Sequence, residues 1–119
     1  METNQQVSNQ PPVGQWPPTY QLGHLVATTE PFGSNRAGTL GIVYEVVEHA
    51  DGPSVGILLQ NGHDIGRFDP AEQEQSLVYR GDSGLRYEFT TPRQLRMDYS
   101  QGVFEKAFAR DEGPVNETL

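Results

Sequence analysis

Hydrophobic and polar residues alternate in short runs through the middle of the chain, and this period of two is typical of β-strands. The first run covers residues 22–30. The second covers residues 42–49 and would place Ile42, Tyr44 and Val46 on one face of its strand. We therefore expect a protein built mainly from a β-sheet.

Two turn sequences divide the runs that follow. Asp51-Gly52 and Asn61-Gly62 are both hairpin sequences, and Asn61-Gly62 is the stronger of the two. Between them, three alternating residues point to one face: Val55, Ile57 and Leu59. Residues 63–68 would form the return strand. Together with the preceding run, these segments predict a three-stranded meander with tight turns.

A short helical turn and two further strands are expected next. Asp69 suits a helix N-cap, Pro70 suits the first helical position, and the helical turn should end near Gln75. Residues 77–80 and 85–90 alternate again, so they predict two more strands joined by a glycine-containing turn.

The last expected element is a C-terminal helix, with Thr91 as its cap and Pro92 as its first residue. After Pro92, apolar residues recur at spacings of three to five, as one helix face requires: Leu95, Tyr99, Val103, Ala107 and Phe108. Gly102 interrupts the run at a cost of about 1 kcal/mol relative to alanine. The pattern is compatible with one kinked helix or with two short helices.

The two ends of the chain differ in composition from its middle. Residues 1–18 are dominated by Gln, Asn, Ser, Pro and Gly, and they predict a flexible tail. The acidic residues 111–119 predict a second one. A single domain over residues 19–110 remains between them.

A short linear motif lies at the boundary of the first tail. Pro17-Pro18-Thr19-Tyr20 fits the PPxY pattern that WW domains bind. Alternatively, Trp16 and Tyr20 fold back and cover one end of the domain. We favour the second interpretation because large aromatic side chains gain much from burial.

The excess of acidic residues limits the kinds of molecule that this chain can be expected to bind. The 119 residues include 8 Lys and Arg against 16 Asp and Glu, a formal net charge of −8. Such a chain repels phosphate backbones, so a protein partner with a basic surface is expected rather than direct nucleic-acid binding. There is no cysteine, no signal sequence and no long apolar run. We therefore expect no disulfide, no membrane contact and a cytoplasmic location, while a homodimer stays open.

A first strand, a longer loop, a tight meander, a helical turn and a closing strand together resemble the small SH3-like β-barrels, most closely those of the KOW and Tudor kind. Two glycine-containing stretches carry this resemblance: Gly23-His24-Leu25-Val26 and residues 38–46. It covers about residues 22–90. The resemblance implies a mainly β fold, a barrel of about five to six antiparallel strands with a short helical turn and a C-terminal helix.

The chain departs from both kinds of domain at the places where they bind ligands. KOW domains that bind nucleic acid display basic residues around their loops, whereas the corresponding stretch here holds only Arg36. Tudor-type readers use a cage of several aromatic side chains. Four residues are candidates for such a cage, although Tyr44 is expected in the core: Phe32, Tyr44, Phe68 and Tyr79. The resemblance therefore implies an architecture and no particular ligand.

Two overlapping motifs have meanings that the rest of the chain does not support. Gly81-Asp82-Ser83-Gly84 is the nucleophile tetrapeptide of serine proteases, but a chain of this length has no room for the two barrels of that family. Arg80-Gly81-Asp82 is the integrin-binding tripeptide, which would matter only in a secreted protein. A simple turn explains all of these residues.

His63-Asp64 matches the paired metal ligands of HD-type hydrolases, which need further ligands on other helices. The chain has only two other histidines, His24 and His49. We expect surface histidines here, and we predict no enzyme activity, no metal and no cofactor.

Seven residues are candidates for binding a partner. They comprise one aromatic residue of the long loop, charged residues around the helical turn, and two arginines one turn apart on the C-terminal helix. These are Phe32, Asp64, Arg67, Asp69, Glu72, Arg93 and Arg96.

Three functions remain open. The favoured one is a small acidic, non-catalytic interaction module that binds another protein through its loops or its C-terminal helix. The second is a phage or mobile-element inhibitor that acts as an acidic decoy for a nucleic-acid-binding host factor. The third is a small-molecule or nucleotide binder, with a pocket near His63, Asp64 and Arg67.

Overall fold

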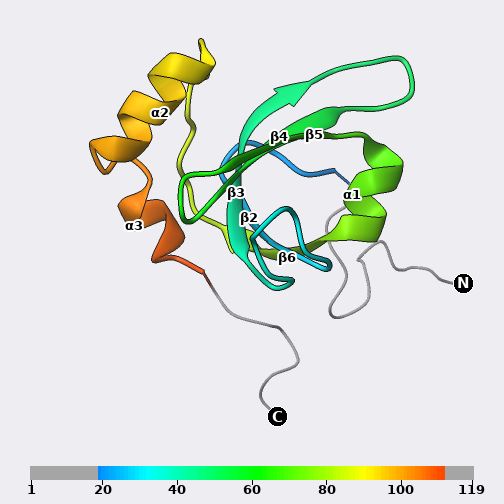
Figure 1. Ribbon diagram of the computed structural model, residues 1–119. Coiled ribbons are helices and arrows are strands. Elements are labelled where there is room, and N and C mark those ends of the chain that lie inside the picture. Colours follow the sequence, from blue (N-terminus) through cyan, green and yellow to red (C-terminus); the bar gives the residue numbers. More distant parts are fainter. Residues whose placement is uncertain (1–18, 112–119) are drawn as a thin grey trace, which may run out of the picture.

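The computed structural model describes residues 19–111, which form one antiparallel five-stranded sheet and three short helices (Figure 1). The strands are β2 (His24–Thr28), β3 (Leu40–Val47), β4 (Ser54–Leu59), β5 (Asp64–Phe68) and β6 (Leu77–Asp82). The helices are α1 (Pro70–Ser76), α2 (Pro92–Ser100) and α3 (Glu105–Phe108). The prediction of a mainly β protein is confirmed.

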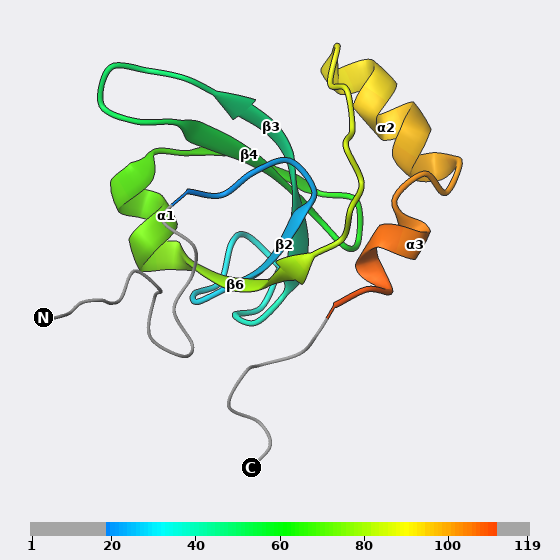
Figure 2. The ribbon, with the colours of Figure 1, turned by 180° about the vertical axis from the view of Figure 1, so that it is seen from behind.

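The strands lie in the order β5-β4-β3-β2-β6. The meander β3-β4-β5 forms as predicted, and β6 returns to pair with β2. The sheet is open, because β5 and β6 are its two edges and do not pair with each other. Both ribbon views show that the sheet is strongly curled, with α1 near its open side and α2 and α3 outside it (Figure 2).

Two clusters of buried side chains pack on the two faces of the sheet. The inner cluster lies on the concave face and contains Tyr20, Val26, Val43, Val55, Ile57, Leu59, Phe68 and Leu77. The outer cluster lies between the sheet and the C-terminal segment and contains Leu25, Ile42, Tyr44, Leu58, Leu95, Phe104, Ala107 and Phe108. Because both faces are covered, β4 is buried along its whole length.

A β-bulge in β3 corrects the predicted faces of that strand. Val43 pairs with Ile57 and Glu45 pairs with Gly56, so the residue between them has no partner of its own. This extra residue shifts the alternation by one position. Val46 therefore packs against the inner cluster, and not beside Tyr44 as the simple alternation predicted.

The predicted strand over residues 85–90 is wrong. The segment is extended, but it pairs with no strand. Its apolar residues pack down onto the outer cluster instead: the Phe89 ring centroid is 5.0 Å from that of Tyr44, and the Tyr87 ring is 4.9 Å from Phe104. The alternation was real, but it describes packing on a sheet face and not a place within the sheet.

The helix boundaries follow the predicted capping residues. The Asp69 side chain accepts a hydrogen bond from the Glu72 backbone N–H at 2.8 Å, and the Glu72 side chain accepts one from the Asp69 N–H at 2.9 Å. This is a complete capping box. Thr91 caps α2 in the predicted way. The backbone of Gly102 has a φ of 86°, so the C-terminal helix divides there into two.

Candidate functional site

Helix α1 ties together three parts of the chain that are distant in sequence. The Gln73 side chain donates to the backbone oxygens of Pro53, at 2.9 Å, and Phe68, at 2.8 Å. At the C-terminal end of the helix, the Thr29 hydroxyl donates to the Gln75 backbone oxygen at 2.9 Å and the Ser76 hydroxyl donates to the Glu30 carboxylate at 2.8 Å. The β3–β4 turn and the segment after β2 are therefore both held against α1.

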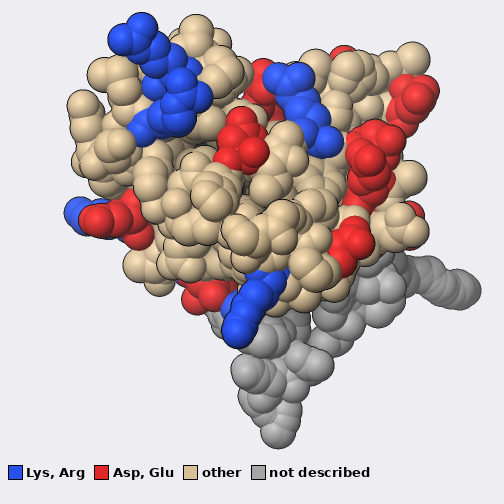
Figure 3. Space-filling model, in the orientation of Figure 1, with Lys and Arg blue, Asp and Glu red and all other residues tan. Residues whose placement is uncertain are grey.

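This arrangement gathers six exposed carboxylates, which we call the acidic end: Glu30, Glu48, Asp51, Asp69, Glu72 and Glu74. Figure 3 shows Asp and Glu atoms along the right of the molecule, over α1 and the β3–β4 turn. Within residues 19–111, none of the six forms a salt bridge. The acidic end is thus a concentration of uncompensated negative charge.

Three carboxylates elsewhere in the fold have arginine partners: Glu45, Asp82 and Asp111. The Arg67 guanidinium donates to the Glu45 carboxylate. This hydrogen bond raises the pKa of Arg67. Arg86 pairs with Asp82 at 3.3 Å. The Arg86 hydrogen bond, followed by that of the Gly84 backbone N–H, lowers the pKa of Asp82. Pairing of this kind is what the acidic end lacks.

Four exposed cations at the opposite end of the domain also have no acidic partner among the described residues: Arg93, Arg96, Lys106 and Arg110. Basic atoms lie over α2 at the upper left of Figure 3. Arg93 and Arg96 lie one turn apart on α2, as predicted. The structure therefore separates these two arginines from Asp69 and Glu72, although all four were candidates.

Asp64 and Arg67, the two candidates on β5, make contacts within the sheet. Both oxygens of the Asp64 carboxylate lie 3.0 Å from the Tyr44 hydroxyl, which donates to them. Burial, and then the Asp64 charge, raise the pKa of Tyr44. The Tyr44 ring reaches Asp64 by crossing over Gly56, where a Cβ atom would lie 2.7 Å from the ring.

The four aromatic residues that could form a cage do not come together. The Phe32 ring packs against Phe68, with the ring centroids 5.5 Å apart. Tyr44 lies in the outer cluster on the opposite face of the sheet, as expected for a core residue. Tyr79 lies beside Tyr20, with the centroids 6.4 Å apart. Phe32 is partly buried against the inner cluster.

His63 belongs to a polar network that fastens the long loop to the β4–β5 turn. One ring nitrogen of His63 lies 3.0 Å from the side-chain nitrogen of Asn35. The Asn61 side chain donates to the Asn35 side-chain oxygen at 2.6 Å. Among residues 19–111, no group of three or more His, Asp or Glu side chains is arranged to hold a metal ion.

The residues of the protease-like and integrin-like motifs have structural contacts. The Ser83 hydroxyl donates to the Gly23 backbone oxygen at 2.7 Å and accepts from the Leu85 N–H. Arg80 donates to both oxygens of the Asp111 carboxylate, at 3.0 and 2.7 Å. The turn explanation therefore accounts for Ser83, and Arg80 fastens the end of the described chain to β6.

The burial of His24 beside Tyr20 and Tyr79 corrects the expectation of surface histidines. Tyr20 is itself buried, in agreement with the interpretation that it folds back onto the domain, and Trp16 lies outside the described residues. His24 is 7% exposed, and its Nδ1 accepts a hydrogen bond from the Gln21 N–H at 3.1 Å. Burial lowers the pKa of His24, against the opposing effect of Asp82. Burial raises the pKa of Tyr20, whose hydroxyl has no hydrogen-bond partner among residues 19–111. A histidine within an apolar strand gave no separate indication that it would be buried.

Two surface pockets lie on the outer side of the sheet. One, of about 480 Å³, is bordered by the unpaired 85–90 segment and by Tyr44, Glu45 and Val46 of β3. The other, of about 420 Å³, lies between Gln60 and the α2–α3 turn. Neither is lined by His63, Asp64 or Arg67, which were the residues expected around a small-molecule pocket.

Comparison of the chain with protein-family models, with curated proteins and with solved structures finds no match. None of the helices in residues 19–111 has the length and apolar character needed to cross a membrane.

Proposed function

We propose that this chain is a small non-catalytic interaction module that binds a basic surface of another protein through its acidic end. The observation that carries the proposal is the gathering of six exposed carboxylates without a single salt bridge among the described residues. Like charges held close together repel one another, and a surface of opposite sign relieves that repulsion on binding.

The rigidity of this end supports the proposal. Hydrogen bonds from Gln73, Thr29 and Ser76 hold α1 to the neighbouring segments, so the carboxylates are positioned before a partner arrives. Binding then requires little ordering of the module itself, which leaves more of the interaction energy as affinity. Of the seven candidate residues, Asp69 and Glu72 belong to this surface.

We further propose that the sheet is an SH3-like barrel that is open at one side. In support, β6 closes onto β2, the meander β3-β4-β5 follows, and the short helix α1 connects β5 to β6. This is the order that the resemblance implies. The basic groove of a nucleic-acid-binding protein is one surface that the acidic end could bind. The same proposal therefore includes the function of an acidic decoy for such a protein.

The proposal is tested on proteins captured by the full chain from an extract of its source cells. Carbodiimide coupling joins carboxylates directly to neighbouring amines, so the joined residues can be identified by mass spectrometry. We expect coupling to captured partners at Asp51, Glu72 and Glu74, and captured protein that is released by moderate salt. Coupling concentrated at Glu88 or Glu105, or capture that persists at high salt, contradicts the proposal.

A further inference from the structure

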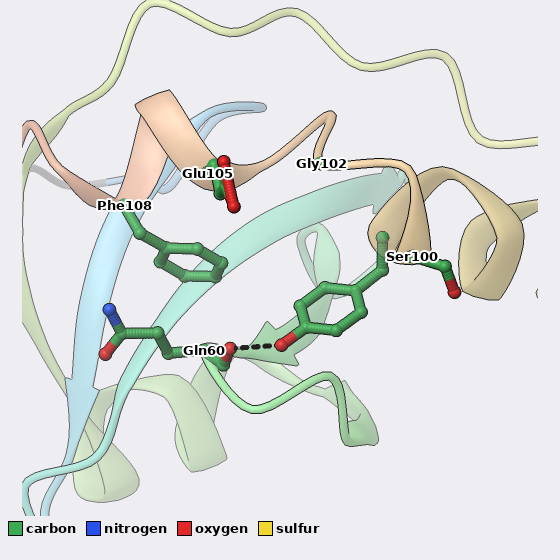
Figure 4. A pocket seen from close by; sticks show the side chains of 6 residues that line it. Gln60, Ser100, Gly102, Glu105 and Phe108 are labelled. Atoms are coloured by element: carbon green, nitrogen blue, oxygen red, sulfur yellow. Dashed lines mark hydrogen bonds between the residues drawn. The ribbon is translucent and has the colours of Figure 1, made fainter.

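The pocket of about 420 Å³ lies at the other end of the domain from the acidic end and has no assigned role. Its lining residues come from the β4–β5 turn, from α2, from the α2–α3 turn and from α3: Gln60, Tyr99, Ser100, Gly102, Glu105 and Phe108. Figure 4 shows Phe108, Glu105 and Gln60 around the opening. A volume of this size suits a small ligand or a single long side chain.

The pocket is formed in advance of any ligand. The Tyr99 hydroxyl donates to the Gln60 backbone oxygen at 2.7 Å, the contact drawn in Figure 4. The Tyr99 ring also lies against Gly62, where a Cβ atom would come within 2.7 Å of it. The Gly102 N–H donates to the backbone carbonyl oxygen of Tyr99 at 3.0 Å. Because Gly102 has no side chain, the α2–α3 turn leaves the opening clear.

The lining offers hydrogen-bond acceptors and aromatic faces, but no cation. Within residues 19–111, neither the Glu105 carboxylate nor the side-chain amide of Gln60 has a hydrogen-bond partner. The Tyr99 hydroxyl oxygen, which uses its hydrogen on Gln60, can still accept a hydrogen bond. Acceptors and two aromatic rings therefore border this space, and Glu105 is the one charged residue among its lining residues.

We propose that this pocket binds a primary alkylammonium group. Such a group can donate N–H hydrogen bonds to the Glu105 carboxylate, and its charge is attracted both to Glu105 and to the aromatic faces. Its methylene chain can lie between the rings of Tyr99 and Phe108. A quaternary ammonium has no N–H to donate to the Glu105 carboxylate, and an anion would be repelled by Glu105. A lysine side chain of a protein and a free polyamine share this chemistry.

The test uses the full 119-residue chain, labelled with ¹⁵N, and pentylammonium as the probe. We expect saturable shifts of the backbone amide resonances of Gln60, Tyr99 and Gly102, and no such shifts with 1-pentanol, which has the same length without the charge. Glu105→Gln keeps the shape of the side chain but removes its charge, and should weaken binding about tenfold. Glu88→Gln, which removes an exposed charge outside both this pocket and the acidic end, should leave the affinity unchanged.

Two further probes distinguish the source of the ammonium group. Nα-acetyl-lysine N-methylamide, whose side-chain ammonium is free, should bind best if a protein supplies the ammonium group. Spermidine should bind best if a free polyamine supplies it. Shifts that do not saturate, equal shifts with 1-pentanol, or full affinity in Glu105→Gln overturn the proposal. So does tighter binding of tetramethylammonium than of pentylammonium. Because the probes are small amines, none of these results depends on the protein partner of the acidic end.

Discussion

The two ends of the molecule are held by different forces. At the acidic end, α1 is fastened by its capping box and by side-chain hydrogen bonds to three neighbouring segments. At the other end, α2 and α3 are fastened mainly by apolar packing, with Leu95 and Phe104 each 1% exposed in the outer cluster. Polar fastening leaves a charged surface outside, whereas aromatic packing leaves a pocket between the elements. The difference means that each end can be perturbed without the other.

The largest effect is expected from Phe104→Ala. Removing this buried ring should destabilise the protein by about 3–5 kcal/mol, because a cavity remains under α2 and α3. Urea denaturation measures the free energy of unfolding. The neighbouring residue Val103 is 40% exposed, so Val103→Ala should cost at most about 0.5 kcal/mol. Similar losses in the two variants would show that the helices do not depend on aromatic packing.

An intermediate effect is expected from Gly56→Ala, which changes the sheet between the two ends. The new methyl group would meet the Tyr44 ring at 2.7 Å. Overpacking of this kind costs about 1–3 kcal/mol. In a Tyr44→Leu background the ring is absent, so the same substitution should cost clearly less in a double-mutant cycle. Strictly additive losses would mean that the ring does not need to cross this glycine.

Asp69→Ala should destabilise the acidic end by about 1 kcal/mol, because the N-cap acceptor of α1 is lost. Hydrogen exchange should show faster opening of the α1 amides and unchanged protection in α2. Glu74→Ala, on the same helix, removes a carboxylate that has no hydrogen-bond partner in the described part of the chain, and it serves as the control. Equal loss in both variants would indicate a general effect of charge and not of the cap.

The smallest effect is expected from pH. Since burial lowers the pKa of His24 from 6.5, the unfolded chain takes up a proton first as the pH falls. The free energy of unfolding should therefore decrease below about pH 6.5 and level off below the folded-state pKa. His24→Asn, which keeps an acceptor for the Gln21 N–H, should lose this step. A step of the same size in the variant would contradict the assignment to His24.

Patterns over a few neighbouring residues were enough to predict the hairpin turns and the helix caps. The three-stranded meander and the capping residues Asp69 and Thr91 depend on residues a few positions apart. The bulge at Tyr44 and the position of residues 85–90 depend on contacts between distant segments. Periodicity cannot distinguish a strand within a sheet from an extended segment that packs on its face.

The candidate site shows the same division. Asp69 and Glu72 were identified because they lie beside a predicted helix start. Glu30 and Asp51 were missed, because α1 brings them there through the Ser76 and Gln73 side chains. The pocket lined by Gln60 and Glu105 joins residues 45 positions apart, and no spacing in the sequence connects them.

The measurement that tests the central claim most directly compares two charge reversals, Glu74→Lys in the acidic end and Glu88→Lys in the 85–90 segment. Both residues are exposed and without a salt bridge in the described structure, and both variants change the net charge equally. The affinity for the captured partner is measured for each at low salt. We predict a loss of roughly tenfold for Glu74→Lys and little change for Glu88→Lys, because only the first lies where the basic partner binds. Equal affinities for the two variants would contradict a partner surface at the acidic end.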